Sequence, residues 1–329
     1  MQPRPGRAGP AVSASNLTKA YSATTGLFGI DLAVGSGEVV ALLGPNGAGK
    51  TTAMRILTTL LKPDAGEVVI GGYDALREPG KVRAVIGIAG QAVSVDDKLS
   101  GLENLTMFGR LSRLGKKDAR SRAACLLEQF DLAAAANKPV KAYSGGMRRK
   151  LDLAASLLVA PPVLFLDEPT SGLDPASRAA LWDTISDLAQ AGSAIVLTTQ
   201  YLEEADRLAD QVVLIDQGRI VATGSPRELK ARIGRARFEL TVKTGSDLAR
   251  LCAALDGLVT VTDPARRTVS IVLEDCGGPG LAGLHEALKR AAAASVPVEG
   301  YILRQASLDD VFFQLTKRTK TSAGTAGAD

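Results

Sequence analysis

A glycine-rich run between an apolar segment and a helical one constrains this chain most. Residues 44–52 read GPNGAGKTT and directly follow the apolar residues 39–43. Because Gly44, Gly47 and Gly49 lack side chains, the backbone can curl with its N–H groups around phosphate oxygens, and the following helix adds its positive N-terminal end. The pattern and its context are those of a P-loop, which leaves little room for the alternative of an ordinary glycine-rich turn.

The P-loop predicts specific contacts with a nucleoside triphosphate. Lys50 can reach the β- and γ-phosphates, and the Thr51 hydroxyl can ligate Mg²⁺. The predicted phosphate-binding residues are Gly44, Pro45, Asn46, Gly47, Ala48, Gly49, Lys50, Thr51 and Thr52.

The order of apolar runs predicts an α/β domain over about the first 230 of the 329 residues. Short β-branched runs alternate with helical ones, which is typical of a largely parallel sheet. Candidate strands are Val39–Leu43, Val85–Ala89, Val163–Asp167, Ala194–Thr199 and Val212–Asp216. Between the second and third strands, residues 100–158 are rich in helical patterns, so we expect a helical subdomain inserted into the α/β core.

The pattern changes after about residue 235. The run of predicted elements there is βαββαβ, the order of a ferredoxin-like α+β fold. A last helix is predicted from Ser307, with Asp310 completing a variant capping box. We therefore expect a nucleotide-binding domain at 1–234, a C-terminal domain at 235–316 and a disordered tail at 317–329.

A second polar cluster follows a buried strand. The apolar residues 163–166 lead directly into Asp167 and Glu168, a Walker B pattern. Ligands of open α/β sheets bind at the carboxyl ends of strands, so Asp167 is placed to hold Mg²⁺ and Glu168 to orient and deprotonate a water. The alternative, a polar strand end that caps a turn, is weak beside a P-loop.

Further motifs indicate a family. Residues 143–148, YSGGMR, resemble the LSGGQ-type signature of ABC ATPases, and Ser171–Asp174 matches the D-loop of that family. Gln91 stands at the position of the Q-loop glutamine, and Tyr21 where an adenine-stacking aromatic is found. Singly, these signals are weak, since Ser-Gly-Gly is also a common turn and Tyr21 could be a core aromatic.

The resemblance implies how the motifs act. Ser144, Gly145 and Gly146, with Asp174, would contact the ATP that the P-loop of a second copy holds, so the active unit would be a homodimer. Helix N-termini bind anions in this way. Gln91 would contact both Mg²⁺ and a membrane-embedded partner. The implied catalytic residues are Glu168, Lys50, Gln200 and Gln91, and the implied metal ligands are Thr51, Gln91 and Asp167.

Gln200 departs from the family pattern, which has a histidine there. An amide can donate a neutral hydrogen bond to the γ-phosphate but carries neither a proton nor a charge. We expect hydrolysis to be retained, since Glu168 is present. The single histidine of the chain, His285, lies on a predicted C-terminal helix and fits a solvated or packed residue better than a substitute.

Composition argues against several other classes. The net charge of +4 predicts neither nucleic-acid nor lipid binding. The longest apolar stretch, 153–166, is shorter than the roughly 20 residues that span a bilayer, and no secretory signal opens the chain. Three scattered cysteines fit a reducing cytosol without a disulfide or zinc site.

The transporter type is indicated by Gln200, the YSGGM signature and the segment 307–316 together. They resemble the daunorubicin-resistance exporter ATPases, which implies export of a drug-like or amphipathic metabolite through a separate permease, with this subunit at the cytoplasmic face of the membrane. A C-terminal role in regulation or dimerisation is implied too. A weakly hydrolysing switch and an ATPase for lipid or polysaccharide export stay open as alternatives. Chromosome-organising and ribosome-associated ATPases are disfavoured, because long heptad coils and a second P-loop are absent from the sequence.

Overall fold

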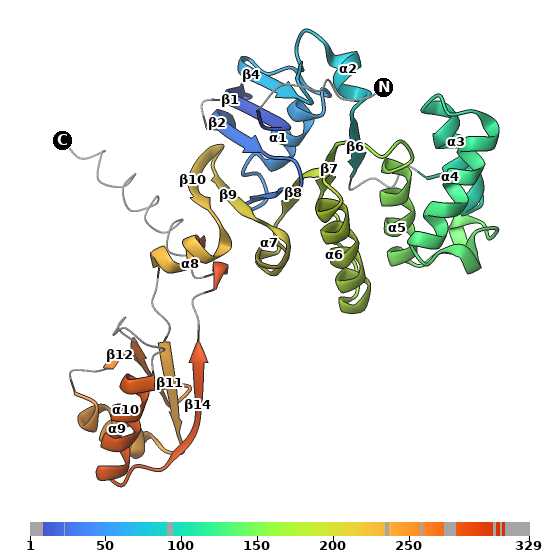
Figure 1. The fold of residues 1–329 in the computed structure, drawn as a ribbon. Helices are drawn as coiled ribbons and strands as arrows, with labels where there is room; N and C mark the ends of the chain where they lie inside the picture. The colour runs from blue at the N-terminus through green and yellow to red at the C-terminus, as the bar shows by residue number, and fades with distance from the viewer. Residues whose placement is uncertain are drawn as a thin grey trace. The chain divides into compact units, whose positions relative to one another are not determined.

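The computed structural model describes residues 9–22, 24–90, 95–233, 237–256, 259–272, 281–304, 307–309 and 311–312. The chain divides into two compact units, Met1–Pro226 and Arg227–Asp329. Each unit is described by itself (Figure 1).

The first unit is built on a six-stranded sheet in the order β10-β9-β3-β8-β7-β6. Its strands are β3 (Val39–Leu43), β6 (Ile86–Ala89), β7 (Val163–Asp167), β8 (Ala194–Thr199), β9 (Gln211–Asp216) and β10 (Arg219–Gly224). All neighbours pair in parallel except β10, which pairs antiparallel with β9. The predicted parallel sheet is confirmed, with strand ends within one residue of those expected.

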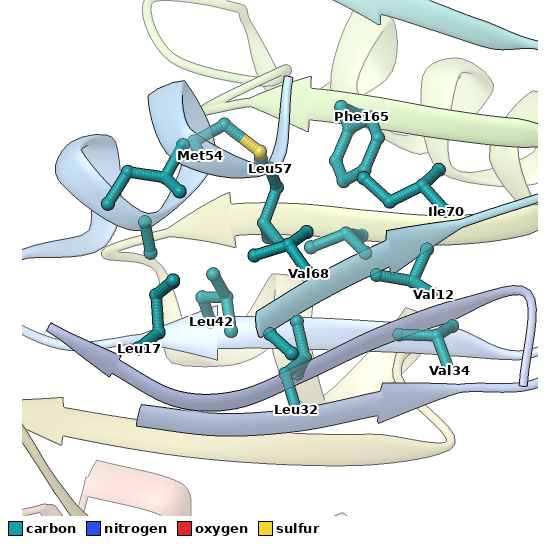
Figure 2. Packing of buried hydrophobic residues seen from close by; sticks show 14 of the residues in the cluster. Val12, Leu17, Leu32, Val34, Leu42, Met54, Leu57, Val68, Ile70 and Phe165 are labelled. Atoms are coloured by element: carbon teal, nitrogen blue, oxygen red, sulfur yellow. The ribbon is translucent and has the colours of Figure 1, made fainter. Parts of the chain in front are cut away.

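A second sheet in this unit was not predicted. It is antiparallel, in the order β2-β1-β4-β5, and consists of β1 (Val12–Ala20), β2 (Gly26–Val34), β4 (Ala65–Ile70) and β5 (Tyr73–Asp74). Helix α1 (Lys50–Leu57) packs against strands of both sheets. Figure 2 shows the shared core, in which side chains of the two sheets meet Met54 and Leu57 of α1. This core fixes the P-loop, which joins β3 to α1.

The helical insertion between β6 and β7 is present as expected. It contains α3 (Gly101–Leu111), α4 (Lys116–Gln129) and α5 (Gly145–Ser156), which contact one another and form one group in Figure 1. Short 3₁₀ turns lie between α4 and α5, at Ala133–Ala135 and Val140–Ala142. Tyr143, just before α5, is buried, and its hydroxyl donates to the Ala135 carbonyl oxygen at 2.8 Å. The start of α5 is thereby tied to the rest of the insertion.

The remaining helices of the first unit are short or flank the sheet. Helix α2 (Pro79–Arg83) precedes β6, while α6 (Pro175–Gln190) and α7 (Leu202–Leu208) follow β7 and β8. In Figure 1, α6 and α7 lie on the other side of the six-stranded sheet from α1. Among the described helices, none has the length and apolar content needed to cross a membrane.

The second unit begins with α8 (Pro226–Ile233) and contains the predicted βαββαβ order. The elements are β11 (Arg237–Val242), α9 (Gly245–Ala254), β12 (Val259–Asp263), β13 (Thr268–Val272), α10 (Leu281–Ala293) and β14 (Val298–Arg304). The sheet is antiparallel in the order β12-β13-β11-β14, so the ferredoxin-like prediction is confirmed. Its core is separate and includes Phe238, Leu240, Leu251 and Ile271.

Several predictions fall outside the described residues. They include Gln91, Cys276, Asp310 of the predicted last helix and the tail 317–329. In that predicted helix, Leu308 and Val311 are buried.

Candidate functional site

The glycines of the P-loop are required for two reasons, which are close contacts with neighbouring atoms and positive φ angles. At Gly44 an added Cβ would lie 2.2 Å from the Ile215 carbonyl oxygen, so β9 crowds the start of the loop. Gly47 and Gly49 have φ angles of 83° and 109°, in the left-handed region that side chains disfavour. Gly49 is also the N-cap of α1, where an added Cβ would approach the Leu27 Cδ2 atom to 2.6 Å. The loop can thus adopt its curled path only with these residues.

Lys50 is directed into this loop. Its side chain is buried, and Nζ donates to the carbonyl oxygens of Gly44 at 2.7 Å and Pro45 at 3.0 Å. Burial lowers the pKa of the Lys50 ammonium, while the nearby carboxylates of Glu168 and Asp167 act in the opposite direction. The result is a positive group at the base of the loop, close to both Walker B acids.

A polar cavity of about 250 Å³ opens above the loop. It is lined by Tyr21, Thr25, Gly26, Asn46, Gly47, Gly49, Lys50, Thr51, Thr52 and Glu168. The structure therefore brings Tyr21 and six of the nine predicted P-loop residues together with Glu168, while Gly44, Pro45 and Ala48 do not line the cavity. Thr25 and Gly26 were not predicted. They reach the cavity because β1 pairs with β2, and no sequence motif indicates that pairing.

Tyr21 lies at the edge of this cavity, just past the end of β1. Its side chain is 57% exposed, so the alternative that it is a core aromatic is wrong. Its backbone N–H donates to the Thr25 carbonyl oxygen at 2.8 Å, which fixes the turn that leads into β2. The ring is thus available to a flat ligand.

Thr198 on β8 organises the two Walker B acids. Its hydroxyl donates to Asp167 Oδ1 at 2.5 Å and accepts from the Glu168 backbone N–H at 3.0 Å. The Thr198 carbonyl oxygen also accepts from that N–H, at 3.1 Å. Glu168 has a φ of 48°, a strained conformation for a residue with a side chain, so these bonds hold it where it faces the cavity. Thr198 was missed, because its role arises from the register that pairs it with Asp167.

The signature residues do not line the cavity of their own chain. Ser144 is the N-cap of α5, and its hydroxyl accepts from the Met147 backbone N–H at 3.2 Å. Ser144 and Gly145 are exposed, so the start of this helix is open to an anion from outside the chain.

Asp174 likewise lies outside the cavity of its own chain. It caps the N-terminus of α6, where its carboxylate accepts from the Ser177 backbone N–H at 3.0 Å and from the Ser177 hydroxyl at 2.6 Å. Bonds from the Ser177 side chain and backbone lower the pKa of the Asp174 carboxyl. The exposed carboxylate therefore has a structural task at the start of α6.

Gln200 is exposed at the carboxyl end of β8, and it does not line the cavity either. The Thr199 hydroxyl accepts from the Tyr201 backbone N–H at 2.9 Å and so closes a small turn around Gln200. At the carboxyl end of β6, the outermost strand, the carbonyl oxygen of Gly90, the residue before Gln91, accepts a hydrogen bond from Arg149 Nη1 on α5 at 2.6 Å. His285 is exposed on α10, in the second unit.

Comparison with known proteins identifies the arrangement. The ABC transporter family model matches residues 27–171. The chain is 46% identical to the daunorubicin-resistance ATP-binding protein DrrA3 of Streptomyces coeruleorubidus, over 95% of this chain and 99% of that one. It is 49% identical to the doxorubicin-resistance ATP-binding protein DrrA of Mycobacterium tuberculosis, over 87% of each chain.

A solved structure shares the fold. It is a dimeric ATP-binding cassette in a post-hydrolysis state bound to ADP and phosphate, with a TM-score of 0.59 and 25% identity, covering 65% of this chain and 98% of that one. The family match, the relatives and the P-loop fold agree. The chain belongs to the ABC transporter family and is an ATP-binding, ATP-hydrolysing protein of the daunorubicin- and doxorubicin-resistance type.

Proposed function

We propose that this ATPase works as a homodimer and energises export of a drug-like or amphipathic metabolite through a separate membrane permease. The observation that supports it best is a divided site. The P-loop, Lys50 and Glu168 meet at one cavity, while the exposed Ser144 and Asp174 of the same chain stand outside it. A second copy could supply the missing half.

The cavity can hold a triphosphate with its phosphates in the P-loop. The curled backbone offers N–H groups, and Lys50, which now bonds two carbonyl oxygens, can turn its ammonium to the β- and γ-phosphates. Tyr21 stacks on the base with its exposed ring. The buried Lys50 ammonium would thereby balance negative charge near the γ-phosphate.

Mg²⁺ fits the residues present. Thr51 lines the cavity, and Asp167, which directly precedes the lining residue Glu168, is close enough to act on the charge of Lys50, so hard oxygen donors are at hand. When bound with the nucleotide, Mg²⁺ would neutralise charge on the phosphates. Thr51 and Asp167 would hold it, together with Gln91.

Glu168 has the position of a general base. Its side chain is almost fully buried at the cavity, and Thr198 fixes its backbone. It would accept a proton from the water that attacks the γ-phosphate. Gln200, on the turn after the neighbouring strand, would orient the γ-phosphate through its amide without a proton of its own.

Dimerisation would complete the site. In the dimer, Ser144, Gly145 and Gly146 would place a hydroxyl and free N–H groups of α5 on the γ-phosphate held by the other copy. The solved cassette that shares this fold is itself a dimer with ADP and phosphate. Loss of the bridging phosphate on hydrolysis would release the two copies, which is how the chemistry could drive a permease at the cytoplasmic face of the membrane.

The Glu168→Gln variant tests both steps. In cells that also carry a candidate permease subunit, we expect the parent chain to lower daunorubicin accumulation and Glu168→Gln to abolish that effect. In purified form, the variant should bind ATP but release phosphate at least about 10²-fold more slowly, since the general base is lost.

Glu203→Gln is the matched control, because Glu203 is an exposed glutamate of α7 that pairs with Arg178 at 3.9 Å. It should behave as the parent. Equal phosphate release by Glu168→Gln and the parent would refute the assignment of the base. Rapid hydrolysis without any change in daunorubicin accumulation would exclude daunorubicin as the exported metabolite.

A further inference from the structure

Glu204 is a glutamate that the nucleotide site does not use, yet it is fully buried. It lies on α7 with no exposed surface. Trp182 Nε1 on α6 donates to its Oε1 atom at 3.2 Å. Its second oxygen, Oε2, and the hydroxyl of the neighbouring Thr170 have no hydrogen-bond partner of ordinary geometry among the described residues. A buried carboxyl so sparsely bonded is costly, and few survive without a task.

The surroundings of Glu204 join two segments of the site. Thr199, a polar neighbour of the Glu204 carboxyl, closes the turn that carries Gln200. Thr170, another neighbour, follows Glu168 by two residues and begins the loop that leads to Asp174. Because side chains alternate along a strand, Thr198 serves the Walker B acids on one face of β8 while Thr199 faces Glu204 on the other.

Among the residues that the structure describes, no cation forms an ion pair with this carboxyl. Arg178 on α6 is the nearby positive group, but its guanidinium lies over the Tyr201 ring at 5.0 Å, and it contacts Glu203 at 3.9 Å. Burial raises the pKa of the Glu204 carboxyl, and the nearby polar groups of Thr199, Thr170 and Trp182, with the charge of Arg178, offset this only in part. Burial thus favours the neutral form of this carboxyl more than water does.

We propose that Glu204 is a positioning residue for ATP hydrolysis, which ties the turn carrying Gln200 to the segment that follows Glu168. The inference rests on the proposed function, since it takes Gln200 and Glu168 to act on the same γ-phosphate. Glu204 does not line the nucleotide cavity. It acts by keeping the ends of β7 and β8 in one fixed relation, so that the amide and the base meet the nucleotide together.

The test compares two substitutions in the full chain with Mg-ATP. Glu204→Gln keeps the size, the donor and the acceptor of a neutral carboxyl, so we expect kcat within about twofold of the parent. Glu204→Leu fills the space but makes no hydrogen bonds, so we expect kcat to fall about tenfold with KM nearly unchanged. If the residue served packing alone, leucine would be tolerated or even stabilising, and kcat would not fall.

A double-mutant cycle tests whether Glu204 acts through Gln200. If it does, Gln200→Ala with Glu204→Leu should release phosphate no more slowly than Gln200→Ala alone, because the turn has nothing left to position. Thermal melting and binding of a fluorescent ATP analogue check that each variant folds. Should Glu204→Leu fail to fold, Trp182→Phe, which removes the donor to Oε1, takes its place in the same cycle.

The results for the Glu204 variants and for Glu168→Gln together distinguish a failure of this inference from a failure of the proposed function. Parent-like kcat in Glu204→Leu, or losses that multiply in the double variant, would overturn the role of Glu204, provided that Glu168→Gln is inactive in the same assay. If Glu168→Gln also hydrolyses ATP normally, the proposed function itself fails.

Discussion

At the scale of single residues, Thr198 decides the geometry of the hydrolytic side of the site. One hydroxyl satisfies the Asp167 carboxylate and the Glu168 backbone N–H together. Glu168 keeps a φ of 48° only because such bonds compensate for the strain. A residue that does not line the nucleotide cavity thereby controls where the base points.

Thr198→Val should therefore weaken both stability and turnover. Valine has the same shape but removes the hydroxyl from the Asp167 oxygen and leaves the Glu168 N–H with the Thr198 carbonyl oxygen alone. Such a loss typically costs about 1–3 kcal/mol in the free energy of unfolding. We expect a lower kcat as well, measured by phosphate release beside urea unfolding.

Thr58→Val provides the matched control for that prediction. Thr58 is also buried, but its hydroxyl donates to Met54 in its own helix, at 2.8 Å, so its loss should cost about 1 kcal/mol or less. Equal effects of the two substitutions on kcat would contradict the role of Thr198.

Some residues of the site could be predicted from sequence motifs, whereas others could not. A motif identifies the P-loop glycines, Lys50 and the Walker B acids, because these residues lie at fixed spacing along the chain. Thr198, Thr25 and Glu204 contribute through strand register or through the packing of α7, which depends on contacts between distant segments. Gln91 was predicted from the motif order alone, and its position lies outside the described residues.

At the scale of elements, α3 shows how the helical insertion is fixed at its entry. Ser100 accepts from the Glu103 backbone N–H at 3.2 Å, and Glu103 Oε2 accepts from the Ser100 backbone N–H at 2.8 Å. The pair is a complete capping box, and the bonds from Ser100 lower the pKa of the Glu103 carboxyl. The helix therefore begins at one defined residue.

Ser100→Ala should destabilise the insertion by about 1 kcal/mol, the usual cost of losing an N-cap. Circular dichroism during urea unfolding measures it. Ser112→Ala, at the exposed other end of α3, should cost less, because that serine caps no N-terminus. A larger loss at Ser112 than at Ser100 would be incompatible with this assignment.

The elements themselves were predicted unevenly, for a physical reason. The parallel strands are buried on both faces and read as continuous apolar runs, such as Val39–Leu43. Strands β1 and β2 mix buried and exposed positions and contain register shifts, so their sequences give no clean alternation. Their pairing became visible only in the structure.

At the scale of the whole molecule, the two units carry separate hydrophobic cores. Every residue that lines the nucleotide cavity belongs to the first unit. We propose that the nucleotide-binding domain ends near residue 234 and that the rest serves regulation or dimer stability.

A chain that ends at Ile233 tests this division. Because distant, independent sites contribute additively, it should bind ATP within about twofold of the full chain. It should form dimers less readily at the same protein concentration, as measured by sedimentation velocity with ATP in the Glu168→Gln background. Unchanged dimerisation would remove the proposed role of the second unit, and a large loss of ATP affinity would show that the units are not independent.

The separation of the two cores has an evolutionary consequence. Selection for nucleotide chemistry acts on side chains that all lie before α8. Mutations in the ferredoxin-like unit leave those side chains unchanged. The sequence of that unit can therefore change, or the unit can be exchanged between lineages, while the nucleotide site stays the same. Among descendants of one ancestor, divergence should therefore accumulate fastest in the C-terminal third.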